Sequence, residues 1–357
     1  MKIGRTVLIL VTIGVLLHHS LAFPAVSWKR ILFKNANCIA AINHTIYVGV
    51  NNEGIYRTVN EGKSWQNIRV GPGPAPSVIS IAIDPKDERI IYAGTSKGLF
   101  KSDDRGWSWA KIWPYRTPPL IIVVDPKDSR VIYADVFKTT DGGRSWKQIF
   151  PFKCAFCDLA VNPRNTEILY ATFWMKGGKV TGLCKSEDGG LTWRKIFDHL
   201  AIPIVIDPRR PMRVYVGGEG KVYRSMDGGD SWAELEEGLP RGLIRSMLID
   251  PINPDIIYAG VDMAGVYRSE DGGETWSPLG RGFPDTVKIM DLAIDPSSPD
   301  FLYAATIWGD PFTNDYGLWR MELPPRRPYH SVNPLGKLLY MWGGIKMYKG
   351  INSLKRR

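Results

Sequence analysis

The stretch that decides the fold is Ser186-Glu-Asp-Gly-Gly-Leu-Thr-Trp193, because related octapeptides recur along the 357-residue chain. Five further copies end at Trp65, Trp109, Trp146, Trp232 and Trp276. The intervals between successive Trp residues are 44, 37, 47, 39 and 44 residues. Intervals of this length indicate one supersecondary unit repeated in tandem rather than two or three unrelated domains.

Each interval also contains further strand-like segments. In the second repeat an apolar run ends in Asp-Pro at Ile81–Pro85, a Tyr-centred segment follows at Tyr92, and Gly98-Leu-Phe-Lys101 leads into the octapeptide. With the segment after the octapeptide, each repeat holds four short strands, which is one blade of a β-propeller. The 13 Trp, 15 Tyr, 36 Gly and 26 Pro fit short strands joined by tight turns.

The two ends of the repeat region complete each other. A seventh third-strand segment, Gly317-Leu-Trp-Arg320, is not followed by an octapeptide. Near the start of the chain, Trp28-Lys-Arg-Ile-Leu-Phe33 matches the strand that follows the octapeptide elsewhere, as in Trp193-Arg-Lys-Ile-Phe197. We therefore predict an all-β fold, a single seven-bladed β-propeller with six octapeptide hairpins, whose ring is closed by the strand Trp28–Phe33.

The octapeptide has one acid position, which is filled by Asn60, Asp104, Asp141, Asp188, Asp227 and Asp271. Its spacing suits a hairpin turn in which the carboxylate accepts backbone N–H groups and Gly supplies a positive φ. Six copies of one acid cannot all be catalytic, and Asn60 replaces the carboxylate in the first copy. We therefore interpret these six residues as structural.

This octapeptide, with the Asp-Pro and Tyr-centred segments between its copies, resembles the repeat of the BNR/Asp-box superfamily of propellers. The superfamily includes sialidases, xyloglucan-type endoglucanases, the receptor domain of sortilins and photosystem II assembly factors. The resemblance thus implies the fold but no single function. It departs from the enzymes in two respects: the Arg-Ile-Pro phrase of sialidases is absent, and xyloglucan-type enzymes pair two propellers where we count one.

Residues 1–22 have the pattern of a secretory signal. Lys2 and Arg5 precede an apolar run, Thr6–Leu17, and Ser20-Leu21-Ala22 offers small residues for cleavage. The run is shorter than the roughly 20 residues needed to span a bilayer. We predict export, to the outside of the cell or to the periplasm; the alternative is an uncleaved signal anchor that tethers the protein to a membrane.

Charge divides the chain into three parts. The net charge is +10, of which residues 1–22 contribute +2 and residues 324–357 contribute +8, so the propeller, residues 23–323, is neutral. A neutral body gives no support to nucleic-acid binding. For the basic C-terminal tail, 324–357, two interpretations stay open: a strap that docks on the propeller or stays disordered, and a weak contact with an anionic membrane. We expect a monomer.

Four cysteines, Cys38, Cys154, Cys157 and Cys184, leave their pairing open. Export would permit disulfides. Cys154 and Cys157 form a CxxC motif, but no second CxxC follows at zinc-site spacing and the chain has only five His residues. We expect no metal and no cofactor.

The face of the propeller opposite the octapeptides is the expected binding face. It carries the inter-blade links and the second-to-third strand connections, of which 172–181 and 305–316 are long. Variable loops with aromatic and charged residues suit a sugar ring or an extended peptide. The ligand-binding candidates are Trp113, Tyr115, Arg116, Trp174, Lys176, Trp308 and Tyr316. The alternative is that the Trp side chains pack on neighbouring loops.

Two classes of function remain. We favour a binding or scaffold propeller that recognises a glycan or a protein, because no acid, base or nucleophile stands apart from the repeat. The alternative is a sialidase- or xyloglucanase-like glycoside hydrolase, which needs two carboxylates about 5–5.5 Å apart for retention or about 6.5–9.5 Å apart for inversion. The loop acids that could serve are Asp198, Asp262, Asp285, Asp310 and Asp315, with Asp310 and Asp315 as the catalytic candidates.

Overall fold

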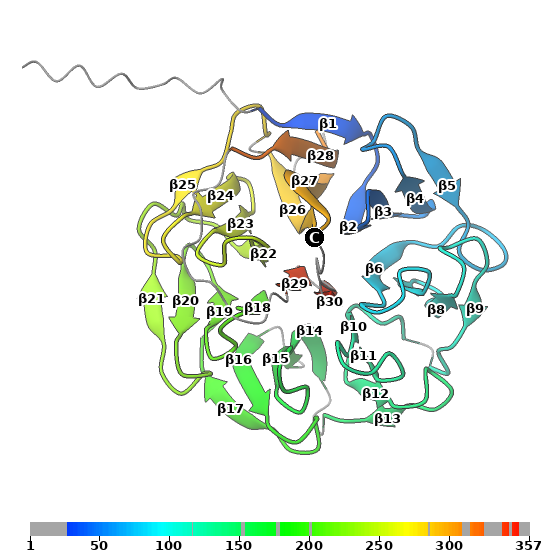
Figure 1. Ribbon diagram of the computed structural model, residues 1–357, viewed down its shortest axis with the longest axis horizontal. Coiled ribbons are helices and arrows are strands. Elements are labelled where there is room, and N and C mark those ends of the chain that lie inside the picture. Colours follow the sequence, from blue (N-terminus) through cyan, green and yellow to red (C-terminus); the bar gives the residue numbers. More distant parts are fainter. Residues whose placement is uncertain are drawn as a thin grey trace, which may run out of the picture.

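The computed structural model describes residues 27–115, 117–150, 154–175, 179–199, 202–284, 286–308, 315–324, 338–342 and 345–349. These residues contain strands and no helix. Seven four-stranded antiparallel sheets stand in a ring (Figure 1), and their inner strands surround the central channel of a β-propeller. The protein is therefore a seven-bladed β-propeller, which confirms the predicted fold.

The blades follow one another along the chain, each from an inner to an outer strand. Blade 1 consists of β2 (Ala36–Ile42), β3 (Thr45–Val50), β4 (Gly54–Thr58) and β5 (Gln66–Ile68). Blade 2 consists of β6 (Val78–Ile83), β7 (Ile91–Thr95), β8 (Gly98–Ser102) and β9 (Ala110–Lys111). Blade 3 consists of β10 (Ile122–Val124), β11 (Ile132–Ala134), β12 (Phe137–Thr139) and β13 (Lys147–Gln148).

Blade 4 consists of β14 (Cys154–Val161), β15 (Leu169–Met175), β16 (Lys179–Ser186) and β17 (Arg194–Phe197). Blade 5 consists of β18 (Ile204–Ile206), β19 (Val214–Gly217), β20 (Val222–Ser225) and β21 (Ala233–Leu235). Blade 6 consists of β22 (Ile244–Ile249), β23 (Ile257–Val261), β24 (Gly265–Ser269) and β25 (Ser277–Pro278). Blade 7 has β26 (Val287–Asp295), β27 (Ser298–Trp308) and β28 (Gly317–Glu322), and its outer strand is β1 (Lys29–Leu32).

The ring closes through β1, as the sequence predicts. Arg30 pairs with Trp319 of β28, so a strand from the N-terminal end completes the last blade. Trp28 is buried, and its indole Nε1–H donates to Leu279 O at 2.8 Å. From the first octapeptide, the Trp65 indole donates to Ile31 O at 3.0 Å, which ties blade 1 to the same strand.

The octapeptide acids hold their own turns. In blade 4, Asp188 accepts hydrogen bonds from Ser186 Oγ at 2.8 Å, from the Thr192 backbone N–H at 2.9 Å and from Thr192 Oγ1 at 2.6 Å. Asn60 makes the same contact with the Ser64 N–H, through an amide oxygen. These bonds are those expected of a structural turn. Hydrogen bonds from Thr192 lower the pKa of Asp188 to about 2, and hydrogen bonds from Ser108 lower the pKa of Asp104 to about 2.

Aromatic residues join each blade to the next. The second-strand tyrosines are almost completely buried, and Tyr170 and Tyr215 donate through their hydroxyls to Gly228 O and Gly272 O in the octapeptide of the following blade. The Trp146 indole donates in the other direction, to Ile112 O of the preceding blade. A buried hydroxyl or indole N–H needs such a partner, so the repeated Tyr and Trp fix the spacing of the blades.

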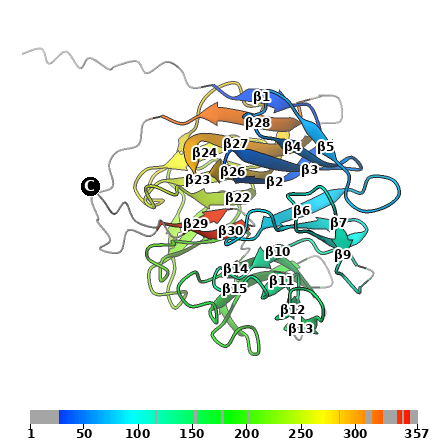
Figure 2. The same ribbon diagram turned by 45° about the vertical axis from the view of Figure 1, so that its right-hand side comes forward.

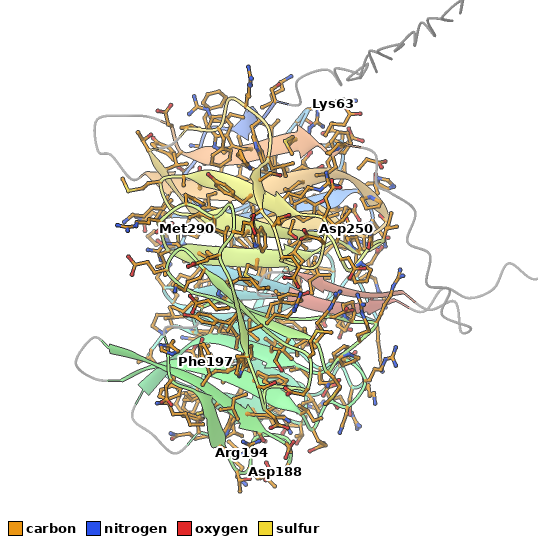
Figure 3. All side chains as sticks on the ribbon, turned by 90° about the vertical axis from the view of Figure 1, so that its left-hand side faces the viewer. Lys63, Asp188, Arg194, Phe197, Asp250 and Met290 are labelled. Carbon is orange, nitrogen blue, oxygen red and sulfur yellow. The ribbon has the colours of Figure 1, made fainter. Side chains whose placement is uncertain are left out.

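Two regions that the sequence suggested as long loops are partly strands. Trp174 pairs with Val180, so β15 and β16 continue through much of 172–181, and β27 runs on to Trp308, which pairs with Val287. Figure 3 shows the β15–β16 hairpin projecting beyond the other blades on the side of Met290. The sequence suggested loops because these segments lie between the recognisable repeat motifs, but strand pairing continues into them.

Part of the C-terminal tail also forms strands. β29 (Leu338–Trp342) and β30 (Ile345–Lys349) pair as an antiparallel hairpin, which lies at the centre of the ring (Figure 1). The predicted signal, residues 1–22, lies outside the described residues. Within the described part of the chain, no helix has the length and apolar character needed to cross a membrane.

Candidate binding site at the mouth of the central channel

We call the side of the ring that carries the inter-blade links the loop face, and the side that carries the octapeptides the Asp-box face. The inner strands of all seven blades begin at the loop face. Around their first residues lies a cavity of about 150 Å³ at the mouth of the channel. Its lining is Asn37, Cys38, Ile79, Ser80, Ile81, Leu120, Ile121, Ile122, Asp158, Ile202, Pro203, Arg245, Ser246, Met290 and Asp291.

β-Bulges shape this cavity. The pairing of the inner strand with its neighbour shifts by one residue in five blades, at Asn37, Ile79, Cys157, Arg245 and Met290. A bulge inserts an extra residue and re-aims its side chain. Four of these five residues line the cavity, so the bulges supply much of its wall.

The charged group at the rim is Arg245. Its guanidinium donates through Nε to Asp262 Oδ2 at 2.5 Å, and its side chain is 34% exposed. Asp262 directly follows β23, and its Oδ1 is buried with no partner. Burial raises the pKa of Asp262, and Arg245 opposes that shift. The pair presents a cation that is partly open to solvent and fixed in one orientation.

Two buried carboxylates lie deeper in the same cavity. Asp291 accepts from the backbone N–H groups of Ile39 at 3.1 Å and of Leu292 at 2.9 Å. Asp158 accepts from Ile204 N–H at 2.7 Å and from Leu159 N–H at 2.8 Å. Each therefore ties its own inner strand to that of the next blade, and burial raises the pKa of Asp291 well above its usual range.

Of the ligand candidates predicted from the sequence, Trp113 offers little surface. It is 4% exposed, its indole donates to Thr117 O at 2.7 Å, and its ring packs at 5.0 Å against Trp146. Tyr115 is half-buried and stacks on Phe137 at 4.1 Å. These two aromatics occupy the packing role that the sequence left as an alternative.

The structure describes only some of the other predicted residues. Tyr316 and Asp315 are partly exposed beside β28. Trp174 and Trp308 lie in β15 and β27, but their side chains are outside the described part of the structure. Arg116, Lys176, Asp285 and Asp310 also lie outside the described residues. Asp198 is exposed and forms an ion pair with Lys195.

The cysteines show no site of their own. Cys38 is buried in the cavity wall as a thiol, and burial raises its pKa well above the usual range. Cys184 is buried as well, whereas the side chains of Cys154 and Cys157 are not described. No group of three or more His, Cys, Asp or Glu side chains that could hold a metal occurs among the described residues.

Sequence reasoning missed the residues of the cavity wall. The sequences of the inner strands are mostly apolar and therefore indicate core. The signal that could have pointed to the cavity wall is a polar residue within such an apolar segment. Asp158 stands in Cys154–Val161, Ser246 in Ile244–Ile249, and Asp291 in Val287–Asp295.

The comparisons with known proteins agree with this architecture. The family model for the BNR/Asp-box repeat matches residues 267–278, which include the octapeptide of blade 6. The chain thus carries a BNR/Asp-box repeat and folds as a seven-bladed propeller. No curated protein is significantly similar to it in sequence.

Solved structures of several kinds share the fold. "YCF48 bound to D1 peptide" superposes with a TM-score of 0.66 at 14% identity, covering 85% of this chain and 99% of that one. The GH74 enzyme of Niastella koreensis gives a TM-score of 0.64 at 17% identity, over 82% of this chain and 55% of the enzyme. The propeller therefore spans about half the length of that enzyme.

A third similar structure is the extracellular domain of the putative one component system BT4673 from B. thetaiotaomicron. It superposes with a TM-score of 0.61 at 15% identity, over 83% of this chain and 40% of that one. At such identities the likeness establishes the fold. Similar propellers thus include an enzyme as well as proteins of other kinds.

Proposed function

We propose that this protein is an exported binding propeller that holds a protein or glycan ligand at the loop-face mouth of its central channel. The observation that carries the proposal is the cavity lined by all seven blades, with five inner-strand bulges at one level and Arg245 at its rim. Concave sites that combine apolar walls with a few oriented polar groups are typical of ligand binding.

The chemistry of the wall favours recognition of a polar ligand. Asn37 donates through its side-chain NH2 group to Asn51 Oδ1 and to Val78 O, each at 2.8 Å, which leaves its amide oxygen as an acceptor for a ligand. Arg245 keeps N–H groups beyond the one that Asp262 accepts. A peptide or a sugar would match both groups, because its carbonyl, carboxylate or hydroxyl oxygens accept from Arg245 and its N–H or O–H groups donate to Asn37. The structure of YCF48 with a D1 peptide offers a precedent for a peptide ligand on this fold.

Export is part of the proposal. It is supported by the pattern of residues 1–22 and by the extracellular domain among the similar structures. Determination of the N-terminus of the mature protein tests it: cleavage predicts a chain that begins at Phe23, and a tethered protein that retains Met1 would show the signal-anchor alternative instead.

The binding proposal is tested on a glycan array and a peptide array, with the full-length protein and two variants. Arg245→Ala should lower binding to the array hits about tenfold or more, because Arg245 supplies the one guanidinium among the described residues of the cavity lining. Arg194→Ala, on the outer strand β17 and far from Met290 in Figure 3, is the matched control and should leave binding unchanged. Equal loss in both variants, or in neither, would contradict the proposed site.

A second candidate is the glycoside hydrolase, and one observation favours it. Asp158 and Asp291 line the same cavity, and a carboxyl with a raised pKa next to a second carboxyl is the pattern of a general acid. Against it, both acids already accept backbone N–H groups from neighbouring strands. Hydrolysis assays on sialosides and β-glucans, run with the wild type and with Asp291→Asn, separate the two functions.

A further inference from the structure

The C-terminal hairpin occupies the channel of its own propeller. β30 contacts the inner strands β6 and β10, and β29 contacts β22 and β26, which belong to blades on the other side of the ring. In Figure 3 the hairpin lies on the right, the side of Asp250, whereas Met290 of the loop-face cavity lies on the left. The hairpin is therefore seated at the Asp-box face of the channel.

The inner strands have unpaired backbone groups that the hairpin can cover. The inner edge of each blade faces the channel, where backbone groups lack a partner strand. In blades 1, 5 and 7 a side chain of the preceding blade accepts such an N–H: Asp291 for Ile39, Asp158 for Ile204, and Ser246 for Leu292. No side-chain acceptor of this kind serves β6, β10 or β22 among the described residues, and these are three of the four strands that the hairpin contacts.

Charge favours the same arrangement. The inner strands end on the Asp-box face in buried acids, of which Asp207 is already ion-paired with Arg210 and Arg213; the others are Asp84, Asp125, Asp250 and Asp295. The segment 335–351 carries Lys337, Lys346 and Lys349 and no acid. A basic segment is therefore attracted to that end of the channel rather than to the rim with Arg245.

We propose that the hairpin of β29 and β30 is a built-in plug that closes the central channel on the Asp-box face. The plug turns the loop-face cavity into a blind pocket, so a ligand enters and leaves from the loop face alone. It also covers inner-strand edges that would otherwise be open to water or to another chain. The plug would close the channel whatever ligand the loop-face cavity binds, so it can be tested on the protein alone.

Hydrogen exchange of the full-length protein, followed by mass spectrometry, tests the plug. Peptides from 338–349 should exchange at least about tenfold more slowly than the same segment as a free synthetic peptide, because docked backbone groups are protected. Exchange at the rate of the free peptide would overturn the proposal.

A double variant, Gly343→Val with Gly344→Val, tests the consequence for the channel. In the sequence these two residues stand between Trp342 and Ile345, which pair in the hairpin, and Val is poorly suited to a two-residue connection between antiparallel strands. The variant should lose protection in 338–349 and speed exchange in β6, β10 and β22, while the outer strands β13 and β17 stay unchanged.

The matched control is Gly350→Val, which lies beyond the last residue of β30 and should keep the wild-type pattern. Unchanged exchange of β6, β10 and β22 in the double variant would overturn the plug. So would faster exchange in every strand alike, because that pattern reports general destabilisation of the propeller rather than opening of the channel.

Discussion

At the scale of single residues, the molecule uses acids in two opposite ways. Partly exposed octapeptide acids such as Asp188 are stabilised as anions by hydroxyl and backbone N–H donors, which lower their pKa. Asp135, in the turn after β11, is largely buried, and burial raises its pKa to about 6 although Leu120 N–H and Ile121 N–H donate to it. The two groups should therefore give opposite dependences of stability on pH.

Asp188→Ala should lower the melting temperature more than Asp188→Asn, because the amide oxygen can still accept the Thr192 N–H, as Asn60 does from Ser64 in blade 1. The folded pKa of Asp188 is lower than that of an unfolded Asp. Its stabilising contribution is thus present above pH 4 and lost as the pH falls through about 2. Thermal unfolding between pH 2 and 7 measures both effects; identical melting temperatures for the two variants at pH 7 would contradict this role.

Asp135→Asn tests the opposite case. The folded pKa of Asp135, about 6, lies above that of the unfolded chain, so the unfolded state loses its proton first as the pH rises. The wild type should therefore lose roughly 2–3 kcal/mol of unfolding free energy relative to Asp135→Asn between about pH 4 and pH 6, and change no further above that. Urea unfolding at pH 4, 5, 6 and 7 gives the difference, and a difference independent of pH would show that Asp135 ionises normally.

At the scale of elements, the closure of blade 7 by β1 carries a separate prediction. Trp28 is 5% exposed, donates to Leu279 O and packs at 5.0 Å against Phe283. Trp28→Ala should cost about 3–5 kcal/mol of unfolding free energy, in the range of buried aromatic truncations. Phe33→Ala, at a residue 65% exposed just beyond the same strand, should cost far less in urea unfolding. Similar costs for both would mean that Trp28 does not close the ring.

The elements also show what the sequence could and could not predict. Blade number, octapeptide hairpins and ring closure were readable, because each follows from a local pattern repeated at a period of about 40 residues. The wall of the cavity was not. Asp291 acquires its role only beside Ile39, and Asp158 only beside Ile204, and such contacts between blades leave no local pattern. The bulge at Arg245 depends on strand register, which the apolar run of β22 does not reveal.

At the scale of the whole molecule, the two faces of the propeller have different roles in this account. The Asp-box face carries the regular turns and the C-terminal hairpin, whereas the loop face carries the bulges, the cavity and Arg245. The inner carboxylates bind strands of adjacent blades together. A ligand at this mouth would contact all seven blades at once.

The most direct test of the central claim is to incubate the ligand identified on the arrays with the full-length protein and to follow it by mass spectrometry. A binding propeller should show saturable binding that is reduced in Arg245→Ala and retained in Arg194→Ala, with the ligand recovered intact. Turnover of the ligand that disappears in Asp291→Asn, in a variant that still binds, would contradict it and make the cavity an active site.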